Sequence, residues 1–268
     1  MSAPTLTPAP PLVATVWKTT VVESKLFLRE PMSVIFGVVF PTVLLLGLGA
    51  IPILRQPSEE FGGARFVEFW APTALVLGIG ILAIQHLAST VSSYREQGVL
   101  RRMSTTPAHP GILLTAQLLV VLAAATAAAV LLVVSAWLVL DVPLPHQPLG
   151  FAVAFLVGFA AVLAIGMLIA AVAPNPRVAN GLATVAYLVL MFLGGVFLPR
   201  FLLPQPLARM GDYAPPGASA LLESWSGDPA VLAAAGDATG APQLVRLAVM
   251  VLIAVVAGAA AAKWFRWE

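Results

Sequence analysis

Cysteine is absent from this 268-residue sequence, and charged residues are scarce, at 10% of the chain. The absence of cysteine excludes disulfides, thiolate metal sites and cysteine nucleophiles. A water-soluble domain carries about 25% charged residues, so this chain has too few to cover a water-facing surface. Hydrophobic residues make up 60% of the sequence instead, and the mean hydropathy is +0.96. The composition therefore predicts an all-α polytopic membrane protein.

The motifs of common catalytic and nucleotide-binding sites are also absent. None of the three lysines follows a glycine, which excludes the GxxxxGK[ST] phosphate loop and ATP hydrolysis by that route. Neither HExxH nor GxSxG occurs, and the three histidines are too scattered to indicate a metal site. We therefore expect no catalytic residues, no metal and no cofactor in this chain.

Long apolar segments separated by short polar connections dominate the sequence. A bilayer core needs about 20 predominantly apolar residues per helix, and six segments qualify. Pro41 and Pro52 fall in the first segment, where a proline removes a helix hydrogen bond and favours a kink. The predicted spans are residues 32–54, 69–92, 110–140, 149–173, 178–198 and 243–262.

Lysine and arginine are unevenly distributed between the two sides that this topology defines. Cytoplasmic connections carry an excess of these residues, and with both termini on one side, nine of the fourteen fall there. Acidic residues are split the opposite way, four against eight. Both termini and residues 93–109 are therefore predicted to be cytoplasmic. The nine are Lys18, Lys25, Arg29, Arg95, Arg101, Arg102, Arg177, Lys263 and Arg266; the other five are Arg55, Arg65, Arg200, Arg209 and Arg246.

Residues 12–30, which precede the first span, are predicted to form an interfacial helix after a disordered tail at residues 1–11. Lys18, Lys25 and Arg29 are separated by seven and four residues and so share one helical face, with mostly apolar residues opposite. A basic stripe backed by apolar residues is typical of a helix lying on the cytoplasmic leaflet. The alternative is a cytosolic helix that continues into the first span.

Residues 199–242 form the one sizeable connection predicted on the outer side. They are rich in proline and glycine, yet they contain apolar stretches that are too short to span a membrane. Such stretches favour re-entrant or interfacial helices packed back against the bundle, because a mobile loop would expose them to water. An ordinary mobile loop is the alternative interpretation.

Polar side chains within the spans gather towards the inner end of the second one. Gln85, His86 and Ser89 lie there, and Gln117 lies in the third span. They either line a pathway that opens to the cytoplasm or form hydrogen bonds between helices, as polar groups in bundles commonly do. Ionisable residues are almost absent from the span interiors, which argues against a proton-coupled secondary transporter and a channel with charged rings.

A short polar segment, YREQGVLRRMSTTP at residues 94–107, separates the second and third spans. Its apolar side chains are suited to docking on a soluble partner, and its charged side chains are suited to ion pairs around that contact. The alternative is a basic anchor that serves only the topology. The candidate coupling residues are Arg95, Glu96, Gly98, Val99, Leu100, Arg101, Arg102 and Met103.

This polar segment resembles the cytoplasmic coupling segment of type-2 ABC exporter permeases, often seen as RExGTLRRLxxTP. Here Val99 replaces the usual Thr and Met103 the usual Leu. The stretch KLFLREP at residues 25–31 is similar to that family's entry into the first span. GGVFLP at residues 194–199 is similar to its fifth-span exit. The similarity covers nearly the whole chain from about residue 12.

The resemblance implies a half-transporter in the inner membrane of a bacterium. Two six-span permeases pair, with the first and fifth spans at the seam, and separate cytoplasmic ATPase subunits bind ATP and Mg and move the coupling helices. Members export drugs, antibiotics, lipids or glycan precursors, and this chain is most similar to antibiotic-resistance permeases. Membrane lipids are expected partners and nucleic acid is not. The alternatives are a non-transport scaffold or assembly subunit and, third, a secondary transporter.

Overall fold

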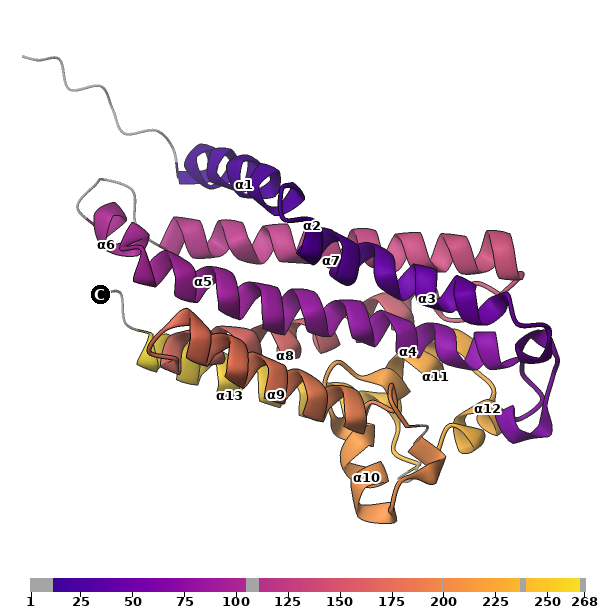
Figure 1. Ribbon diagram of the computed structural model, residues 1–268. Helices are drawn as coiled ribbons and strands as arrows, with labels where there is room; N and C mark the ends of the chain where they lie inside the picture. The colour runs from indigo at the N-terminus through magenta and orange to yellow at the C-terminus, as the bar shows by residue number, and fades with distance from the viewer. Residues whose placement is uncertain (1–11, 105–110, 199, 237–239, 266–268) are drawn as a thin grey trace, which may run out of the picture.

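Helices that run side by side along one direction make up most of the molecule (Figure 1). The computed structural model describes residues 12–104, 111–198, 200–236 and 240–265, and no β-strand occurs among them. Six helices in these residues are long and apolar enough to cross a membrane, which confirms the predicted all-α polytopic fold. The tail predicted to be disordered, residues 1–11, lies outside the described residues.

The first two spans are composite helices, each with a π-helical segment in its interior. A π-helical segment is rare and is commonly found at functional sites. The first span comprises α2 (Pro31–Val34), η1 (Ile35–Val39) and α3 (Phe40–Gly49), and the second comprises α4 (Phe66–Gly80), η4 (Ile81–His86) and α5 (Leu87–Glu96).

The other four spans are uninterrupted α-helices. Two of them begin at a proline, whose fixed φ suits the first helical turn. At about 1.5 Å per residue, the longest extends about 45 Å, which exceeds the roughly 30 Å hydrocarbon core, so it must tilt or protrude. These spans are α7 (Gly111–Leu140), α8 (Pro148–Val172), α9 (Pro176–Leu193) and α13 (Gln243–Trp264).

The first span ends earlier than its apolar composition predicts. Its helix stops at Gly49, and Pro52 begins a separate 3₁₀ turn, Pro52–Arg55, instead of kinking the span. Ile51, which precedes that proline, is extended, as the proline ring requires. Pro41 does lie inside the span, and the π-helical segment is placed where this proline has no N–H to donate to the preceding turn.

The second span forms the centre of the bundle. In its most apolar 18-residue stretch, 83% is buried inside the molecule, whereas the corresponding share in α9 is 17%. Span α8 crosses it closely through glycines: a Cβ on Gly166 would lie 2.0 Å from the carbonyl oxygen of Ala83. A Cβ on Gly158 would lie 2.0 Å from the carbonyl oxygen of Pro216 in the outer region. Small residues thus let backbones approach where no side chain fits.

Helix α1 (Leu12–Leu28) packs against the first half of α7, at the end of the bundle where α6 and the C-terminus lie (Figure 1). Its basic stripe, Lys18, Lys25 and Arg29, is exposed, and Glu23 and Phe27 on the opposite face are buried. The helix is therefore present as expected. Its position at a membrane surface stays a prediction.

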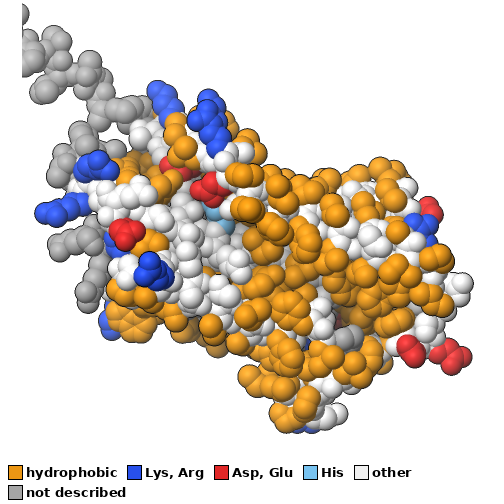
Figure 2. Space-filling view, viewed as in Figure 1, with side chains coloured by type: hydrophobic (Ala, Val, Ile, Leu, Met, Phe, Trp, Pro, Cys, Tyr) orange, Lys and Arg blue, Asp and Glu red, His pale blue; other side chains and the backbone are white. Residues whose placement is uncertain are grey.

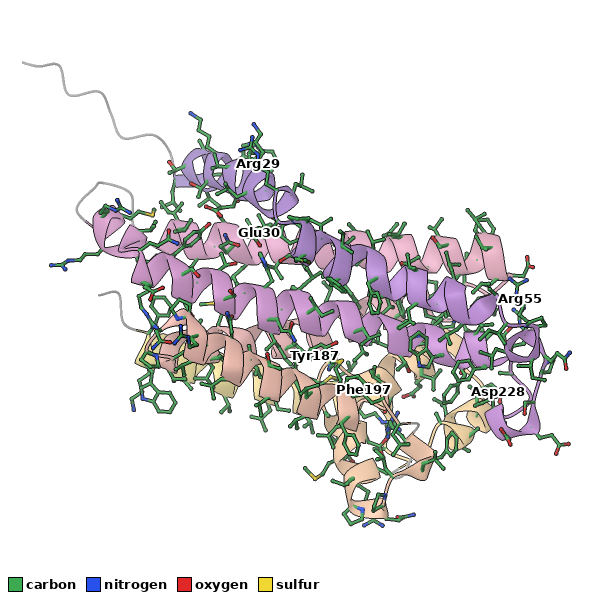
Figure 3. The ribbon with its side chains drawn as sticks, in the orientation of Figure 1. Arg29, Glu30, Arg55, Tyr187, Phe197 and Asp228 are labelled. Carbon is green, nitrogen blue, oxygen red and sulfur yellow. The ribbon has the colours of Figure 1, made fainter. Side chains whose placement is uncertain are left out.

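Short helices cover the opposite end, where Arg55 and Asp228 lie in Figure 3. The most buried of them, Ala218–Ser226, packs against α8 and α4. Arg200 and Asp212 form a buried ion pair within this region. Residues 200–236 are therefore packed against the bundle, and their depth in a membrane stays a prediction. The short helices are η3 (Glu59–Phe61), η5 (Arg200–Leu202), α10 (Gln205–Tyr213), α11 (Ala218–Ser226) and α12 (Pro229–Ala234).

Candidate functional site

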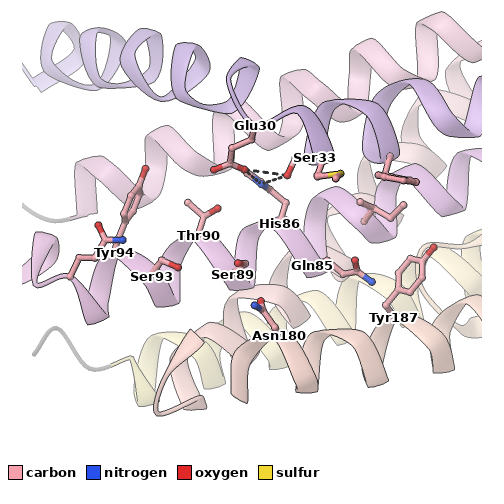
Figure 4. Close-up of a pocket in the computed structure, with 14 residues that line it drawn as sticks. Glu30, Ser33, Gln85, His86, Ser89, Thr90, Ser93, Tyr94, Asn180 and Tyr187 are labelled. Atoms are coloured by element: carbon pink, nitrogen blue, oxygen red, sulfur yellow. Dashed lines mark hydrogen bonds and ion pairs between the residues drawn. The ribbon is translucent and has the colours of Figure 1, made fainter. Parts of the chain in front are cut away.

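A polar cleft opens between the first, second and fifth spans near the α6 end of the bundle (Figure 4). Its volume is about 610 Å³. In Figure 2 a histidine is visible in this part of the surface, beside acidic side chains and white atoms of other side chains and the backbone. The lining residues are Glu30, Met32, Ser33, Phe36, Ile81, Gln85, His86, Ser89, Thr90, Ser93, Tyr94, Gln97, Asn180 and Tyr187.

The second span supplies most of the polar lining because its polar residues recur at helical spacing. Gln85, Ser89 and Ser93 are four residues apart, so they lie on one face of α5 and the π-helical segment before it. That segment, η4, faces η1 of the first span, and a Cβ on Gly37 would lie 2.5 Å from the side chain of Leu82. The two π-helical segments therefore meet, and both contribute to the lining of the cleft.

Three polar side chains join the first and second spans at the rim of the cleft. The Ser33 hydroxyl lies 3.0 Å from His86 Nδ1 and donates to Glu30 Oε2 over 3.2 Å, and His86 Nδ1 lies 3.2 Å from the same carboxylate oxygen. The hydrogen bond from His86 holds the pKa of Glu30 below its ordinary value. His86 Nε2 is buried and has no hydrogen-bond partner among the described residues. His86 is thus both a bridge between helices and part of the cleft wall.

A second polar cluster lies behind the cleft and holds α1 to the bundle. Tyr94 donates a 2.7 Å hydrogen bond to Glu23 Oε2, and the buried Gln117 donates to the same oxygen. Burial raises the pKa of Glu23 despite these two hydrogen bonds. Gln117 was a candidate for the pathway lining, but it is buried among α1, α5 and α7 and does not line this cleft. Gln85, His86 and Ser89 do line it.

The predicted coupling segment forms the end of α5, a turn and the short helix α6 (Val99–Ser104). Gly98 has a φ of 67°, in the left-handed region, and no atom lies within 4 Å of where its Cβ would be. Its role is therefore the bend between the helices rather than a close contact. The part of the segment beyond Ser104 lies outside the described residues.

The candidate coupling residues differ in burial and in what they contact. The Arg95 guanidinium donates to the carbonyls of Ala170, Ala171 and Ala173 and so caps the end of α8. Leu100 is 1% exposed and anchors α6 to the bundle, so its side chain is not available to dock on a partner. Val99 and Met103 are partly exposed. The exposed charged side chains of the set are Glu96, Arg101 and Arg102.

The comparison with protein families is decisive at this point. The family described as ABC-2 type transporter matches residues 15–217, from within α1 to the residue before α11. The chain belongs to the ABC-2 type transporter family. Comparisons with curated proteins and with solved structures found no match.

Membership identifies this ABC-2 chain as a membrane permease of an ABC transporter. In this family the membrane domain is the non-catalytic part and normally works with a separate ATPase subunit. A multi-pass membrane protein follows from the same match and from the six apolar helices.

Several cleft residues of this ABC-2 permease were not predicted from the sequence. Glu30 was assigned to the entry of the first span, and Ser33 fell within that span without being singled out. Asn180 and Tyr187 lie in a fifth span that showed no polar cluster. The spacing of Asn180 and Tyr187, seven residues, puts both on one face of α9 and is the one signal that was available.

Proposed function

We propose that this permease exports a cationic amphiphile through the polar cleft, driven by a separate ATPase that docks at α6. Drug-like molecules, antibiotics, lipids and glycan precursors were the substrate classes implied by resemblance. The observation that carries the narrower proposal is the polar lining of the cleft, which consists of hydroxyl and amide side chains, His86 and one carboxylate. None of the described residues that line the cleft is a lysine or an arginine.

The chemistry of this lining favours a particular type of substrate. The side chain of Glu30 is 51% exposed in the cleft, and its lowered pKa keeps it ionised at neutral pH. Phe36 and Tyr187 add aromatic surface, to which an apolar body or a cation can bind. A molecule with an apolar body, hydrogen-bonding groups and a positive charge would match the aromatic surface, the polar side chains and the carboxylate of this lining.

A second copy of the permease would enclose the cleft. The cleft lies between the first span and α9. The most apolar stretch of α9 is the least buried of the six spans, at 17%, and those of the first span and α13 follow at 28% each. Large apolar side chains such as Val185 and Val189 are exposed along α9. We infer that two copies pair across these spans, so that each cleft faces a shared pathway.

The packing of α6 supports a route from the ATPase to the cleft. Leu100 fixes α6 against the bundle and Gly98 joins it to α5, which carries Ser89 and Ser93 in the cleft wall. A partner that moves α6 would therefore move α5 and the cleft lining with it. Exposed Arg101 and Glu96 are placed to orient that partner through ion pairs.

The test is ATP hydrolysis and transport by the permease and its ATPase in proteoliposomes. Amphiphiles with one apolar body and a cationic, neutral or anionic group would be compared. We expect the cationic member to stimulate hydrolysis most. Glu30→Gln should raise the concentration of the cationic amphiphile needed for half-maximal stimulation roughly tenfold, equivalent to about 1.4 kcal/mol of binding free energy.

Glu60→Gln, which removes an exposed carboxylate at the opposite end, is the matched control and should behave as the unmodified chain. Equal stimulation by the three amphiphiles would overturn the cationic preference. An assembled complex that no amphiphile stimulates and that transports none would instead support the scaffold alternative.

A further inference from the structure

Two adjoining hollows lie on the side of the bundle away from the cleft, and Phe265 lines both of them. The first is an apolar groove of about 480 Å³ between α7, α8 and α13. The groove follows α8 from Ala160 to Met167, about 10 Å at 1.5 Å per residue. Gly258 leaves open space in its wall, because no atom lies within 4 Å of where its Cβ would be. A groove of this shape fits an extended hydrocarbon chain.

The second hollow, of about 640 Å³, is polar and positively charged. It lies between the ends of α8 and α13 and is lined by Arg95, Lys263 and Trp264, and none of the described residues that line it is acidic. Lys263 and Trp264 are exposed. The last carbonyls of α8 would repel an anion, but Arg95 donates hydrogen bonds to them and offsets their partial negative charge.

We propose that these two hollows together bind one anionic phospholipid. The phosphate lies at Lys263, the indole of Trp264 lies at the level of the headgroup, and one acyl chain occupies the groove beside Gly258. Tryptophan is enriched at membrane interfaces, and anionic lipids are concentrated in the cytoplasmic leaflet, where basic side chains attract them. The site lies at the α6 end of the bundle, which carries most of the basic residues.

A lipid fits this surface better than a second copy of the chain. A two-fold symmetric contact across the groove would bring Lys263 close to the same residue of the other copy. Like charges there would repel, whereas a phosphate neutralises the hollow. The proposal does not depend on which substrate the cleft accepts.

Native mass spectrometry of the purified full-length permease tests the site. The probes are phosphatidylglycerol and phosphatidylcholine with identical acyl chains, supplied together. We expect retained phosphatidylglycerol to exceed phosphatidylcholine severalfold. Lys263→Gln should bring the two to equal levels, and Gly258→Leu, which fills the groove, should reduce retention of both.

Two matched controls address charge and bulk. Arg209→Gln removes an exposed positive charge at the opposite end, and Gly47→Leu adds the same side chain to α3, where space is also open. Both should retain lipid as the unmodified chain does. Equal retention of the two lipids by the unmodified chain would overturn the proposal, and so would an undiminished preference in Lys263→Gln. Displacement of the lipid by inorganic phosphate alone would show that only a phosphate site exists.

Discussion

Arginine side chains cap the C-terminal ends of three helices in this molecule. Arg55 donates to the end of α3, Arg65 to the end of α7 and Arg95 to the end of α8. The last carbonyls of a helix have no partner within it, and leaving them unpaired is costly away from water. Arginine suits this position because its planar group presents several donors at once. Three of the eleven arginines of this chain therefore serve to end helices.

Arg95→Gln should destabilise the permease by about 1–3 kcal/mol, because hydrogen bonds from a charged group to three carbonyls are lost. Arg95→Lys keeps the charge but loses the fork of donors, so it should restore only part of the loss. The measurement is thermal unfolding of the purified protein in detergent. Arg209→Gln, at an exposed position, is the control. An Arg95→Gln protein as stable as the unmodified one would disprove the capping role.

Glu23 should make stability depend on pH. Burial raises its pKa above the ordinary value of 4.5, so the folded protein keeps the proton at a pH where the unfolded chain has lost it. The protonated carboxyl therefore contributes to the stability of the fold. This stabilisation is fully present below the unfolded-state pKa of Glu23 and is lost as the pH rises through its folded-state pKa. The unmodified protein should therefore lose stability relative to Glu23→Gln as the pH rises above about 4.5, because the amide does not titrate.

The comparison is a series of unfolding temperatures across that pH range. Glu30 and His86 are the charged or titratable groups near Glu23 besides Tyr94, and both are unchanged in Glu23→Gln. Glu60→Gln, at an exposed position, should follow the unmodified protein at every pH. Parallel curves for Glu23→Gln and the unmodified chain would mean that Glu23 titrates alike in the folded and unfolded states.

The turn between α5 and α6 is the element that a partner ATPase would act on. Gly98 has the left-handed backbone that other residues adopt at a cost of about 1–2 kcal/mol. Asparagine tolerates this conformation and valine does not. Gly98→Val should therefore uncouple ATP hydrolysis from export in the reconstituted complex, and Gly98→Asn should keep most of the export. Equal export by the two variants would leave the turn without a role in coupling.

The spans were predictable because each needs only a long apolar run, and that signal is local. What interrupts the spans was not predictable from such runs. The π-helical segments at Ile35–Val39 and Ile81–His86 leave no mark in the apolar pattern, and the first span ends at Gly49 although apolar residues continue beyond it. Proline at position 52 was visible, but its effect was assigned to a kink instead of a helix end.

The candidate site was predictable only where its residues were neighbours in the sequence. Gln85, His86 and Ser89 form a local polar cluster, so they stood out. Glu23 escaped notice because it lies opposite the basic stripe of its own helix, and its partner Gln117 is 94 residues away. A carboxylate on an otherwise apolar helical face was the signal that it is buried. Distant pairings of this kind depend on tertiary packing, which composition and spacing do not determine.

At the scale of the whole molecule, charge marks the two ends of the bundle. In Figure 2 most of the visible lysine and arginine side chains lie at the end that carries α1 and α6, whereas acidic side chains are seen at both ends. An apolar band covers much of the visible surface between the two ends. Exposed apolar side chains of the spans include Val134, Val185 and Val255. The band matches a hydrocarbon layer, and the asymmetry of charge predicts that the α6 end is cytoplasmic.

Because the chain contains no cysteine, single introduced cysteines test this orientation directly. Gln97 follows α5 at the basic end and Gln56 lies in the connection at the other end, and both side chains are exposed. In intact cells that express the permease without its ATPase, an impermeant thiol reagent should label Gln56→Cys and spare Gln97→Cys. Permeabilised cells should give labelling of both, which shows that Gln97→Cys is accessible. The reverse pattern in intact cells would place α6 outside the cell, where no ATP-driven partner could reach it, and the proposed coupling would fail with the topology.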